Sequence, residues 1–273
     1  MAKLRRLGRN VSQDLVLMNE NKTICAIPLL LLVALLLSGC QAAHIPQSLA
    51  AEPQWVVFTY LDNGEMSARP LLEPWPMRNP SSETEVEMTV DGVQINVALR
   101  KGTAYVYQDD TLVWRGDRSW DVREMLMADL DNDGGQEVAF VLWKPFVLWP
   151  RFLYEDFHFE SPFEEGSLRN HLFLYGWRDG EWRPLWCSSP MADPIREMAV
   201  DDVDADGDNE LVVLEGSYDD NLDEPAYYVT LWRWNGWGFT LHWRSTPGRY
   251  HSLMLHDVTG DEVPDIVLQD GYQ

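Results

Sequence analysis

Short apolar runs recur along the last two thirds of the chain, and polar residues or glycines bound each run. Three of them are EVAFVLW (137–143), ELVVLEG (210–216) and PDIVLQ (264–269). Runs of four to eight residues that are rich in β-branched side chains and end at Gly or Asp indicate buried strands. A second apolar stretch lies before each run, across an acidic loop. The pattern therefore predicts pairs of strands joined by acidic loops.

These pairs belong to a longer repeat. The segments around the loops (122–143, 195–216 and 251–271) align with one another, and the segment 174–190 matches 231–247 without a gap. The two matching segments each place a Gly-containing turn between apolar stretches, which indicates β-hairpins. The segment 104–116 plays the same part in the first unit. One unit is thus a hairpin, a strand, an acidic loop and a strand. The clear units span about 104–145, 171–216 and 227–271.

The repeat predicts an all-β domain over 54–273. A degenerate earlier unit covers the hairpin at 55–75 and the Asp91-Gly92 turn. The hairpin at 55–66 is expected to complete the last group of strands. Trp114, Trp186 and Trp243 recur in register with the repeat, so we expect them in its core.

An insert at 144–170 interrupts the repeat. It is dense in acids and aromatics, and the aromatics that break the repeat are Trp149, Phe152, Tyr154, Phe157, Phe159 and Phe163. Insertions in repeat folds often carry the binding surface. Packing over the edge of the domain is the alternative for this segment.

The N-terminus has the features of an export signal. Residues 24–39 form an apolar run that follows Lys22, ends in Ser38 and Gly39, and is short for a bilayer span, which needs about 20 residues. Leu37-Ser38-Gly39-Cys40 resembles the lipobox of bacterial lipoproteins. That resemblance implies cleavage of residues 1–39, lipidation of Cys40, and a membrane anchor on the extracytoplasmic side of the bacterial cell envelope. Residues 40–53 would be a flexible tether.

The composition limits the partners. The net charge is −23, and residues 1–39 contain five Lys/Arg against two Asp/Glu, so the remaining chain is more acidic still. Such a surface disfavours nucleic acid and favours cations. With Cys40 lipidated, only Cys187 remains after cleavage. No disulfide framework is then possible, and we expect a buried structural thiol at that position.

The loops offer oxygen donors at positions 1, 3, 5 and 9. The candidate metal ligands are Asp129, Asp131, Asp133 and Glu137; Asp202, Asp204, Asp206 and Glu210; and Asp257, Thr259, Asp261 and Asp265. Hard cations such as Ca²⁺ take six to eight oxygens, and alternate side chains of a tight loop can converge on one centre. A solvated acidic turn is the alternative for a single loop, but three matched copies favour Ca²⁺.

The flanks exclude an EF-hand, which requires helices and an acid at position 12. The pattern resembles the calcium loop of FG-GAP (VCBS-like) repeats in integrin-type β-propellers. This resemblance covers about residues 104–271 and implies a small or partial β-propeller with Ca²⁺ in its loops. Glu137 and Glu210 depart from the family's usual Asp. In the third loop, Thr259 removes a carboxylate and Glu262 stands where glycine is usual, so this loop is expected to be the weakest site.

Catalytic signals are absent from the sequence. The six histidines form no H-x-x-x-H spacing, and neither a G-x-S-x-G elbow nor a phosphate-binding glycine loop occurs. We therefore expect a lipid-anchored calcium-binding module that recognises a protein or a glycan. Two alternatives stay open: an extracytoplasmic carbohydrate-active enzyme or a subunit of one, and a structural envelope lipoprotein.

Overall fold

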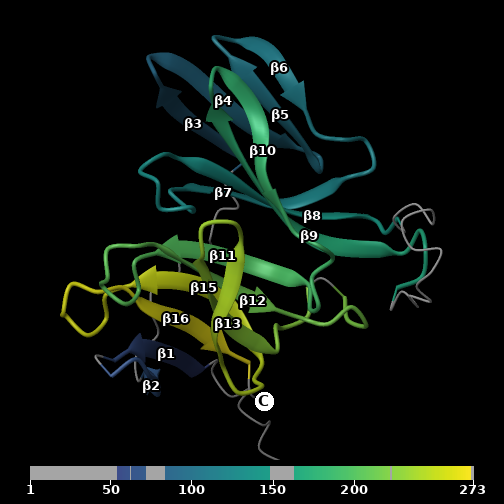
Figure 1. The fold of residues 1–273 in the computed structure, drawn as a ribbon. Helices are drawn as coiled ribbons and strands as arrows, with labels where there is room; N and C mark the ends of the chain where they lie inside the picture. Colours follow the sequence, from purple (N-terminus) through teal and green to yellow (C-terminus); the bar gives the residue numbers. More distant parts are fainter. Residues whose placement is uncertain (1–53, 62, 72–83, 148–162, 222, 272–273) are drawn as a thin grey trace, which may run out of the picture. The chain divides into compact units, whose positions relative to one another are not determined.

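The chain folds into β-strands in every part that the structure describes. The computed structural model describes residues 54–61, 63–71, 84–147, 163–221 and 223–271 (Figure 1). These residues contain strands and connections but no helix, which confirms the all-β class. Accordingly, none of the described residues forms an apolar helix long enough to cross a membrane. The predicted signal peptide, Cys40 and the tether lie outside the described residues.

The strands form four antiparallel sheets of four strands each (Figure 1). The first sheet contains β3 (Glu85–Val90), β4 (Val93–Arg100), β5 (Thr103–Gln108) and β6 (Thr111–Arg115). The second contains β7 (Asp121–Ala128), β8 (Glu137–Pro145), β9 (Leu168–Arg178) and β10 (Glu181–Cys187). The third contains β11 (Ile195–Asp201), β12 (Glu210–Glu215), β13 (Tyr228–Trp234) and β14 (Phe239–Arg244). The fourth contains β15 (Tyr250–His256), β16 (Asp265–Asp270), β1 (Gln54–Tyr60) and β2 (Met66–Leu71).

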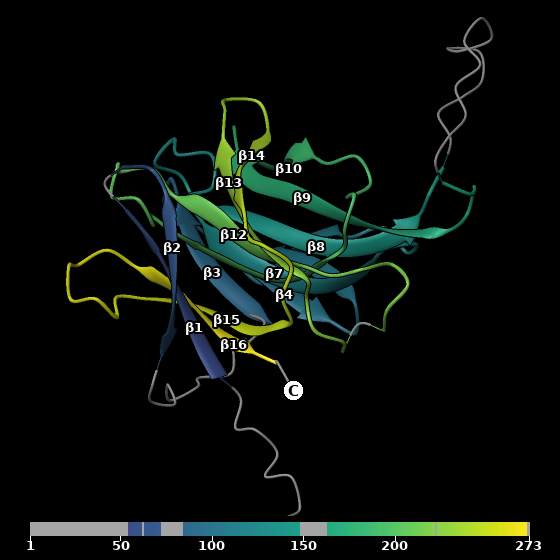
Figure 2. The same ribbon diagram turned by 90° about the horizontal axis from the view of Figure 1, so that it is seen from below.

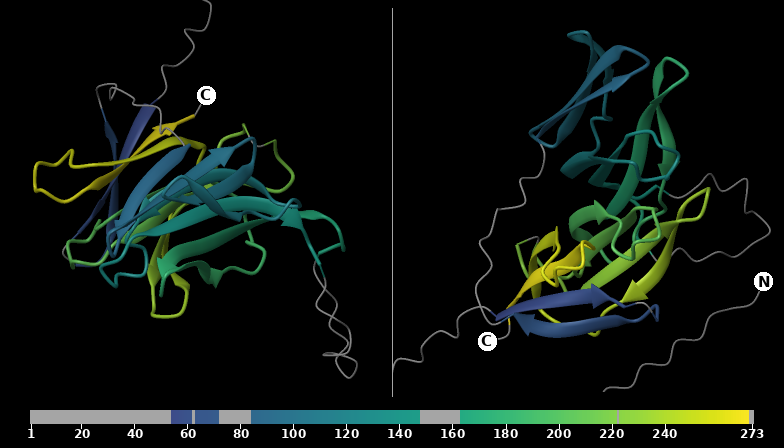
Figure 3. Two further views of the ribbon diagram at one scale, coloured as in Figure 1. Left: turned by 90° about the horizontal axis from the view of Figure 1, so that it is seen from above. Right: turned by 90° about the vertical axis from the view of Figure 1, so that its left-hand side faces the viewer.

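The fourth sheet combines two distant parts of the chain. β1 pairs with β16 in antiparallel register, from Gln54 opposite Asp270 to Phe58 opposite Ile266. Figure 3 shows the N-terminal hairpin, in blue, beside the yellow C-terminal strands. The prediction that this hairpin completes the last group of strands is confirmed.

The sheets are shifted by one hairpin relative to the sequence repeat. Each of the first three sheets consists of two strands around a loop or turn and the hairpin that follows them, and in the fourth sheet the N-terminal hairpin takes that place. The aligned unit instead begins with the hairpin that precedes the two strands. Aligning the repeats gives the spacing between units but does not show where one unit begins. The hydrogen bonds between strands show which strands form one sheet. The degenerate unit has the predicted tight turn, because Val90 pairs with Val93 across Asp91 and Gly92, whose φ angles are 52° and 79°.

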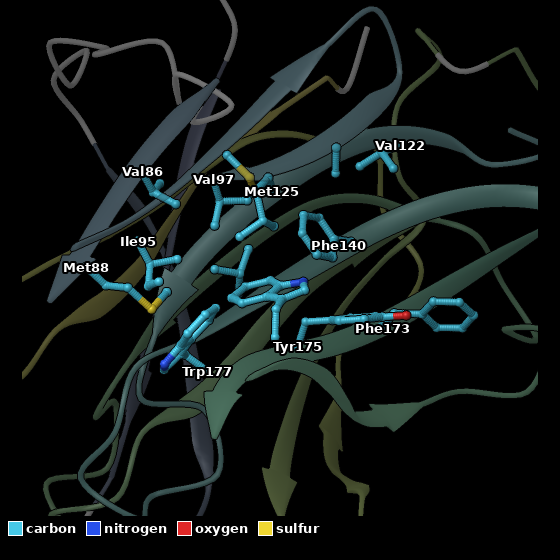
Figure 4. Packing of buried hydrophobic residues seen from close by; sticks show 14 of the residues in the cluster. Val86, Met88, Ile95, Val97, Val122, Met125, Phe140, Phe173, Tyr175 and Trp177 are labelled. Carbon is cyan, nitrogen blue, oxygen red and sulfur yellow. The ribbon is translucent and has the colours of Figure 1, made fainter. Parts of the chain in front are cut away.

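The strand that follows each acidic loop is buried on both faces, which explains the continuous apolar runs. In β8, Val138, Phe140 and Leu142 belong to the core cluster shared by the first and second sheets (Figure 4). Ala139 and Val141 lie on the opposite face, in the cluster shared by the second and third sheets. A further cluster joins the third sheet to the fourth. Among the described residues, no core cluster joins the fourth sheet to the first.

The three repeated tryptophans lie at the boundaries between sheets. Each is partly buried, stands on the last strand of its own sheet and packs against an aromatic ring of the next sheet. The ring-centroid distances are 5.1 Å for Trp114–Tyr175, 5.4 Å for Trp186–Phe239 and 5.4 Å for Trp243–Phe58. The predicted core role is therefore a role in joining successive sheets.

The insert begins as an extension of two paired strands. Lys144 pairs with Arg169 and Pro145 with Leu168, so both ends of the predicted insert belong to β8 and β9 (Figure 2). Phe163 packs edge-on against Phe146, with the ring centroids 5.5 Å apart. The other insert aromatics named above lie outside the described residues.

The expectation for Cys187 is wrong, because its side chain is exposed. This residue ends β10, the outer strand of the second sheet. Alternation along the strand turns Trp186 toward the third sheet and Cys187 away from it.

Candidate functional site

The three acidic loops connect the first two strands of the second, third and fourth sheets. The first loop (129–137) joins β7 to β8, the second (202–210) joins β11 to β12, and the third (257–265) joins β15 to β16. Strands flank every loop, in agreement with the exclusion of an EF-hand.

All three loops have the same backbone conformation. Positive φ angles occur at positions 4 and 6 of each: Asn132 59° and Gly134 85°, Ala205 58° and Gly207 96°, Gly260 81° and Glu262 71°. Glu262, which stands where glycine is usual, thus adopts a left-handed conformation. In each loop the N–H of position 6 donates to the carboxylate of position 1, in the pairs Gly134–Asp129 (2.9 Å), Gly207–Asp202 (3.0 Å) and Glu262–Asp257 (3.0 Å).

The acid at position 9 is buried in every loop. Glu137, Glu210 and Asp265 are 0%, 1% and 2% exposed. One oxygen of each accepts the N–H of position 2, in the pairs Leu130–Glu137 (2.9 Å), Val203–Glu210 (3.1 Å) and Val258–Asp265 (2.9 Å). This contact fixes the loop to the start of the following strand and leaves the second oxygen for another partner.

The first and second loops bring carboxylates together. Oxygens of Asp129, Asp131 and Glu137 lie within 4.8 Å of one another, and so do those of Asp202, Asp204 and Asp206. The acids Asp257, Asp261 and Asp265 of the third loop form no such group among the described residues. Only the first two loops therefore gather a donor set suited to a metal ion.

Each of these two loops also holds a buried oxygen without a hydrogen-bond donor. Asp129 Oδ1 and Glu210 Oε1 accept no hydrogen bond from any described residue. Leaving a buried charged acceptor unsatisfied destabilises a fold unless a cation neutralises it. The donor sets are made of oxygen alone, which suits Ca²⁺.

Burial raises the pKa of several acids in the first two loops. Burial, and then the charges of neighbouring acids, raise the pKa of Glu210 to about 7, although its hydrogen bond from Val203 lowers it. Burial also raises the pKa of Glu137 and of Asp131. In the third loop the N–H of Gly260 instead lowers the pKa of Asp257. The third loop stabilises its own first carboxylate with backbone donors.

Arginines reach the first two loops from the third strand of each sheet. Arg178 Nη2 lies 3.2 Å from Asp133 Oδ2 and 3.9 Å from Asp131 Oδ2, and it contacts Glu137 Oε1. Burial lowers the pKa of Arg178. The hydrogen bond to Glu137 and the charges of the nearby carboxylates raise it by more than burial lowers it, so the net shift is upward.

In the second loop, Arg233 Nε lies 3.3 Å from Glu210 Oε1 and Nη1 lies 3.8 Å from Asp206 Oδ2, while Nη2 contacts Asp204. The Glu210 contact has the distance of an ion pair without the geometry of a hydrogen bond, so Oε1 stays without a donor. In the third loop a hydroxyl replaces the arginine, because Thr59 Oγ1 donates to Asp265 Oδ1 at 2.5 Å.

A cavity separates the second loop from the third. Its volume is about 220 Å³, and Thr59, Tyr60, Asp204, Asp261 and Asp265 contribute to its polar wall. Between the first and second loops, by contrast, three hydrogen bonds connect Asn132 and Asp129 to Asn209.

A second pocket lies between the second and third sheets. It is about 310 Å³ in volume and mostly apolar, and Trp186, Trp232 and Phe239 line it together with Ser188 and Ser189. The Trp232 indole N–H donates to Thr230 Oγ1 at 2.8 Å, which fixes that ring. The size matches the lower end of the range for small-molecule sites, about 300–1,000 Å³.

Comparison of the chain with protein-family models and with curated proteins gives no match. The two arginines and the aromatic pocket were not foreseen. Arg178 and Arg233 occupy non-equivalent positions of the aligned hairpins, so the repeat alone does not single them out.

Proposed function

We propose that this chain is a calcium-binding repeat protein, with Ca²⁺ in the first and second loops. The observation that carries this proposal is the pair of oxygen sets, together with a buried carboxylate oxygen without a hydrogen-bond donor at Asp129 in the first loop and at Glu210 in the second. Asp129, Asp131, Asp133 and Glu137 would hold one ion, and Asp202, Asp204, Asp206 and Glu210 the other. Because extracellular calcium modules bind at about 10⁻⁴–10⁻³ M, both sites would be filled outside a cell.

Four consecutive sheets joined through shared cores support a blade-like arrangement. We therefore keep the FG-GAP-like, propeller-type architecture as the proposed family of folds. In this proposal calcium fixes each loop to the strand behind it and makes successive sheets more rigid.

Calorimetric titration with CaCl₂ tests the metal sites. We expect two ions to bind the full chain in detergent, and one ion to be lost in each of Asp129→Asn and Asp202→Asn. Asp219→Asn, an exposed acid outside the loops, serves as the control. Binding should also raise the melting temperature, because a ligand of the folded state alone stabilises it. A wild-type protein indifferent to millimolar Ca²⁺ would refute the proposal.

For the module's ligand, we propose a glycan that binds in the aromatic pocket between the second and third sheets. Aromatic rings pack against the apolar faces of sugars, and the serine hydroxyls can exchange hydrogen bonds with sugar hydroxyls. The fixed Trp232 ring lowers the entropy lost on binding. A glycan array tests this idea: Ala192→Trp, which places bulk at the pocket wall, should abolish binding. Trp237→Ala, at a ring that is 78% exposed, should not. Capture of a protein without any glycan signal would contradict the glycan assignment.

Attachment to the outer face of a bacterial membrane through lipidated Cys40 remains part of the proposal. Mass spectrometry of the cell-derived protein should find an acylated Cys40 as the first residue. An unmodified Cys40 within a longer chain would contradict it.

A further inference from the structure

The guanidinium groups of Arg178 and Arg233 lie against the oxygens that a metal ion would use. Arg178 contacts the acids at positions 3, 5 and 9 of the first loop, namely Asp131, Asp133 and Glu137. Arg233 contacts the same three positions of the second loop, Asp204, Asp206 and Glu210. In both loops one arginine therefore pairs with three of the four predicted ligands.

These contacts arise independently in the two loops. Gly176, and not Arg178, aligns with Arg233 in the repeat. A Cβ atom at Gly176 would lie 3.1 Å from Arg178 Nη1 and 2.9 Å from Leu185 Cδ1, so the glycine leaves the space that the guanidinium fills. Two different positions thus deliver the same charge to the same kind of loop.

A guanidinium and a divalent ion cannot share these oxygens at close range. Like charges a few ångströms apart repel strongly in a partly buried site. A calcium ion that takes the position 3, 5 and 9 carboxylates must therefore displace the arginine from them. Displacing Arg178 breaks its charge-assisted hydrogen bonds to Asp133 and Glu137, and displacing Arg233 breaks its ion pairs with the acids of the second loop.

We propose that Arg178 and Arg233 are tethered counter-cations, which hold the first and second loops closed without metal and set the calcium concentration at which the loops fill. This inference rests on the proposed calcium function. It gives each cluster of carboxylates a positively charged partner from the same sheet. At the third loop, Thr59 takes the place of the arginine beside Asp265.

Calcium titration of arginine variants of the full chain in detergent tests this. We expect Arg178→Ala and Arg233→Ala each to tighten calcium binding at one site by about tenfold or more, because the competing charge is gone. In EDTA the same variants should melt at a lower temperature than the wild-type protein. Arg178→Lys and Arg233→Lys retain the charge without the planar fork, and they should bind calcium with intermediate affinity.

Arg183→Ala is the matched control, because Arg183 pairs with exposed Asp179 on the same hairpin as Arg178 and contacts no loop acid. It should change neither calcium affinity nor the melting temperature in EDTA. If an alanine variant does not fold in EDTA, the lysine variant is compared with the wild-type protein instead. The lysine variant should then bind calcium more tightly than the wild-type protein does.

The outcomes separate this inference from the calcium function. Wild-type binding with unchanged or weaker binding in the alanine variants would refute the counter-cation role and leave the calcium sites intact. Wild-type binding with tighter binding in both alanine variants would support the counter-cation role. No binding by any of these proteins would overturn both.

Discussion

Asn132 and Asn209 connect the first two acidic loops through reciprocal hydrogen bonds. Asn209 N donates to Asn132 Oδ1 at 2.8 Å, and Asn132 Nδ2 donates to Asn209 O at 3.4 Å. Asn132 is also suited to its position, because its φ of 59° is a conformation that asparagine tolerates better than most residues. The side chain of Asn132 thus hydrogen-bonds both backbone polar groups of Asn209 and joins the second sheet to the third.

Replacing Asn132 with alanine should therefore destabilise the protein. The variant leaves Asn209 N without its acceptor and places alanine in a left-handed conformation, for an expected loss of about 2 kcal/mol in the free energy of unfolding. Urea denaturation measures the loss. Ala205→Asn is the matched comparison at the same position of the second loop (φ 58°), and it should be neutral or stabilising. A loss below about 0.5 kcal/mol in Asn132→Ala would argue against the bridge.

Glu262 is the one position-6 residue that is not glycine, and its φ is 71°. Glu262→Gly should stabilise the third loop by about 1 kcal/mol, because glycine adopts this conformation without strain. Glu262→Ala removes the same carboxylate but keeps the strain, so it should give no comparable gain. Equal melting temperatures for these two variants would show that charge, and not backbone strain, governs this position.

Trp186 joins the second sheet to the third, since its ring packs edge-on against Trp234 and Phe239. Trp186→Ala should lower the free energy of unfolding by about 3 kcal/mol through lost packing. Trp237→Ala provides a control of equal size at a ring that is 78% exposed, with an expected change within about 0.5 kcal/mol. Chemical denaturation compares the two, and similar effects would contradict the assigned role of Trp186.

Glu124 makes stability depend on pH. Its Oε1 accepts the Met198 N–H of the neighbouring sheet at 3.2 Å, and its Oε2 has no hydrogen-bond partner among the described residues. Burial, and to a smaller extent the charge of Glu197, raise its pKa from 4.5 to about 8, against the lowering effect of the Met198 hydrogen bond.

Because the pKa is higher in the folded state, the proton stabilises the fold. This contribution is complete below pH 4.5 and is lost as the pH rises through about 8. In that window stability falls by at most about 1.4 kcal/mol per pH unit. Glu124→Gln keeps an acceptor for the Met198 N–H and cannot titrate. The difference in stability between this variant and the wild-type protein should therefore favour the variant more at pH 8 than at pH 5. Glu181→Gln, at an exposed position, is the control and should leave the pH profile of stability unchanged. If the profile of Glu124→Gln runs parallel to that of the wild-type protein, the assignment of the pH dependence to Glu124 is refuted.

The strands around the loops were predictable because burial on both faces leaves a clear trace in the sequence. Val138 to Leu142 face two different cores in alternation, so every position is apolar. The Asp91-Gly92 turn was equally clear, since two successive positive φ angles require such residues. Three matched loops were needed to predict the donor pattern, and the structure gathers the acids of two of them.

Other features depend on register and on tertiary approach, which the sequence pattern does not encode. Arg178 and Arg233 reach equivalent loops from different positions, and an arginine near a strand end is ordinary on a protein surface. The pocket beside Trp232 forms only where two sheets meet. Exposure of Cys187 depends on which way the end of an outer strand faces.

The pairing of β1 with β16 has a consequence for how the protein is made. Thr59 and Asp265, which hydrogen-bond across this junction, are 206 residues apart, so the first hairpin leaves the ribosome long before its partner strand exists. Until β16 has been made, β1 presents an open edge of the kind that promotes aggregation. A chaperone that shields this edge during synthesis would therefore act on the first strands of the domain rather than on its acidic loops.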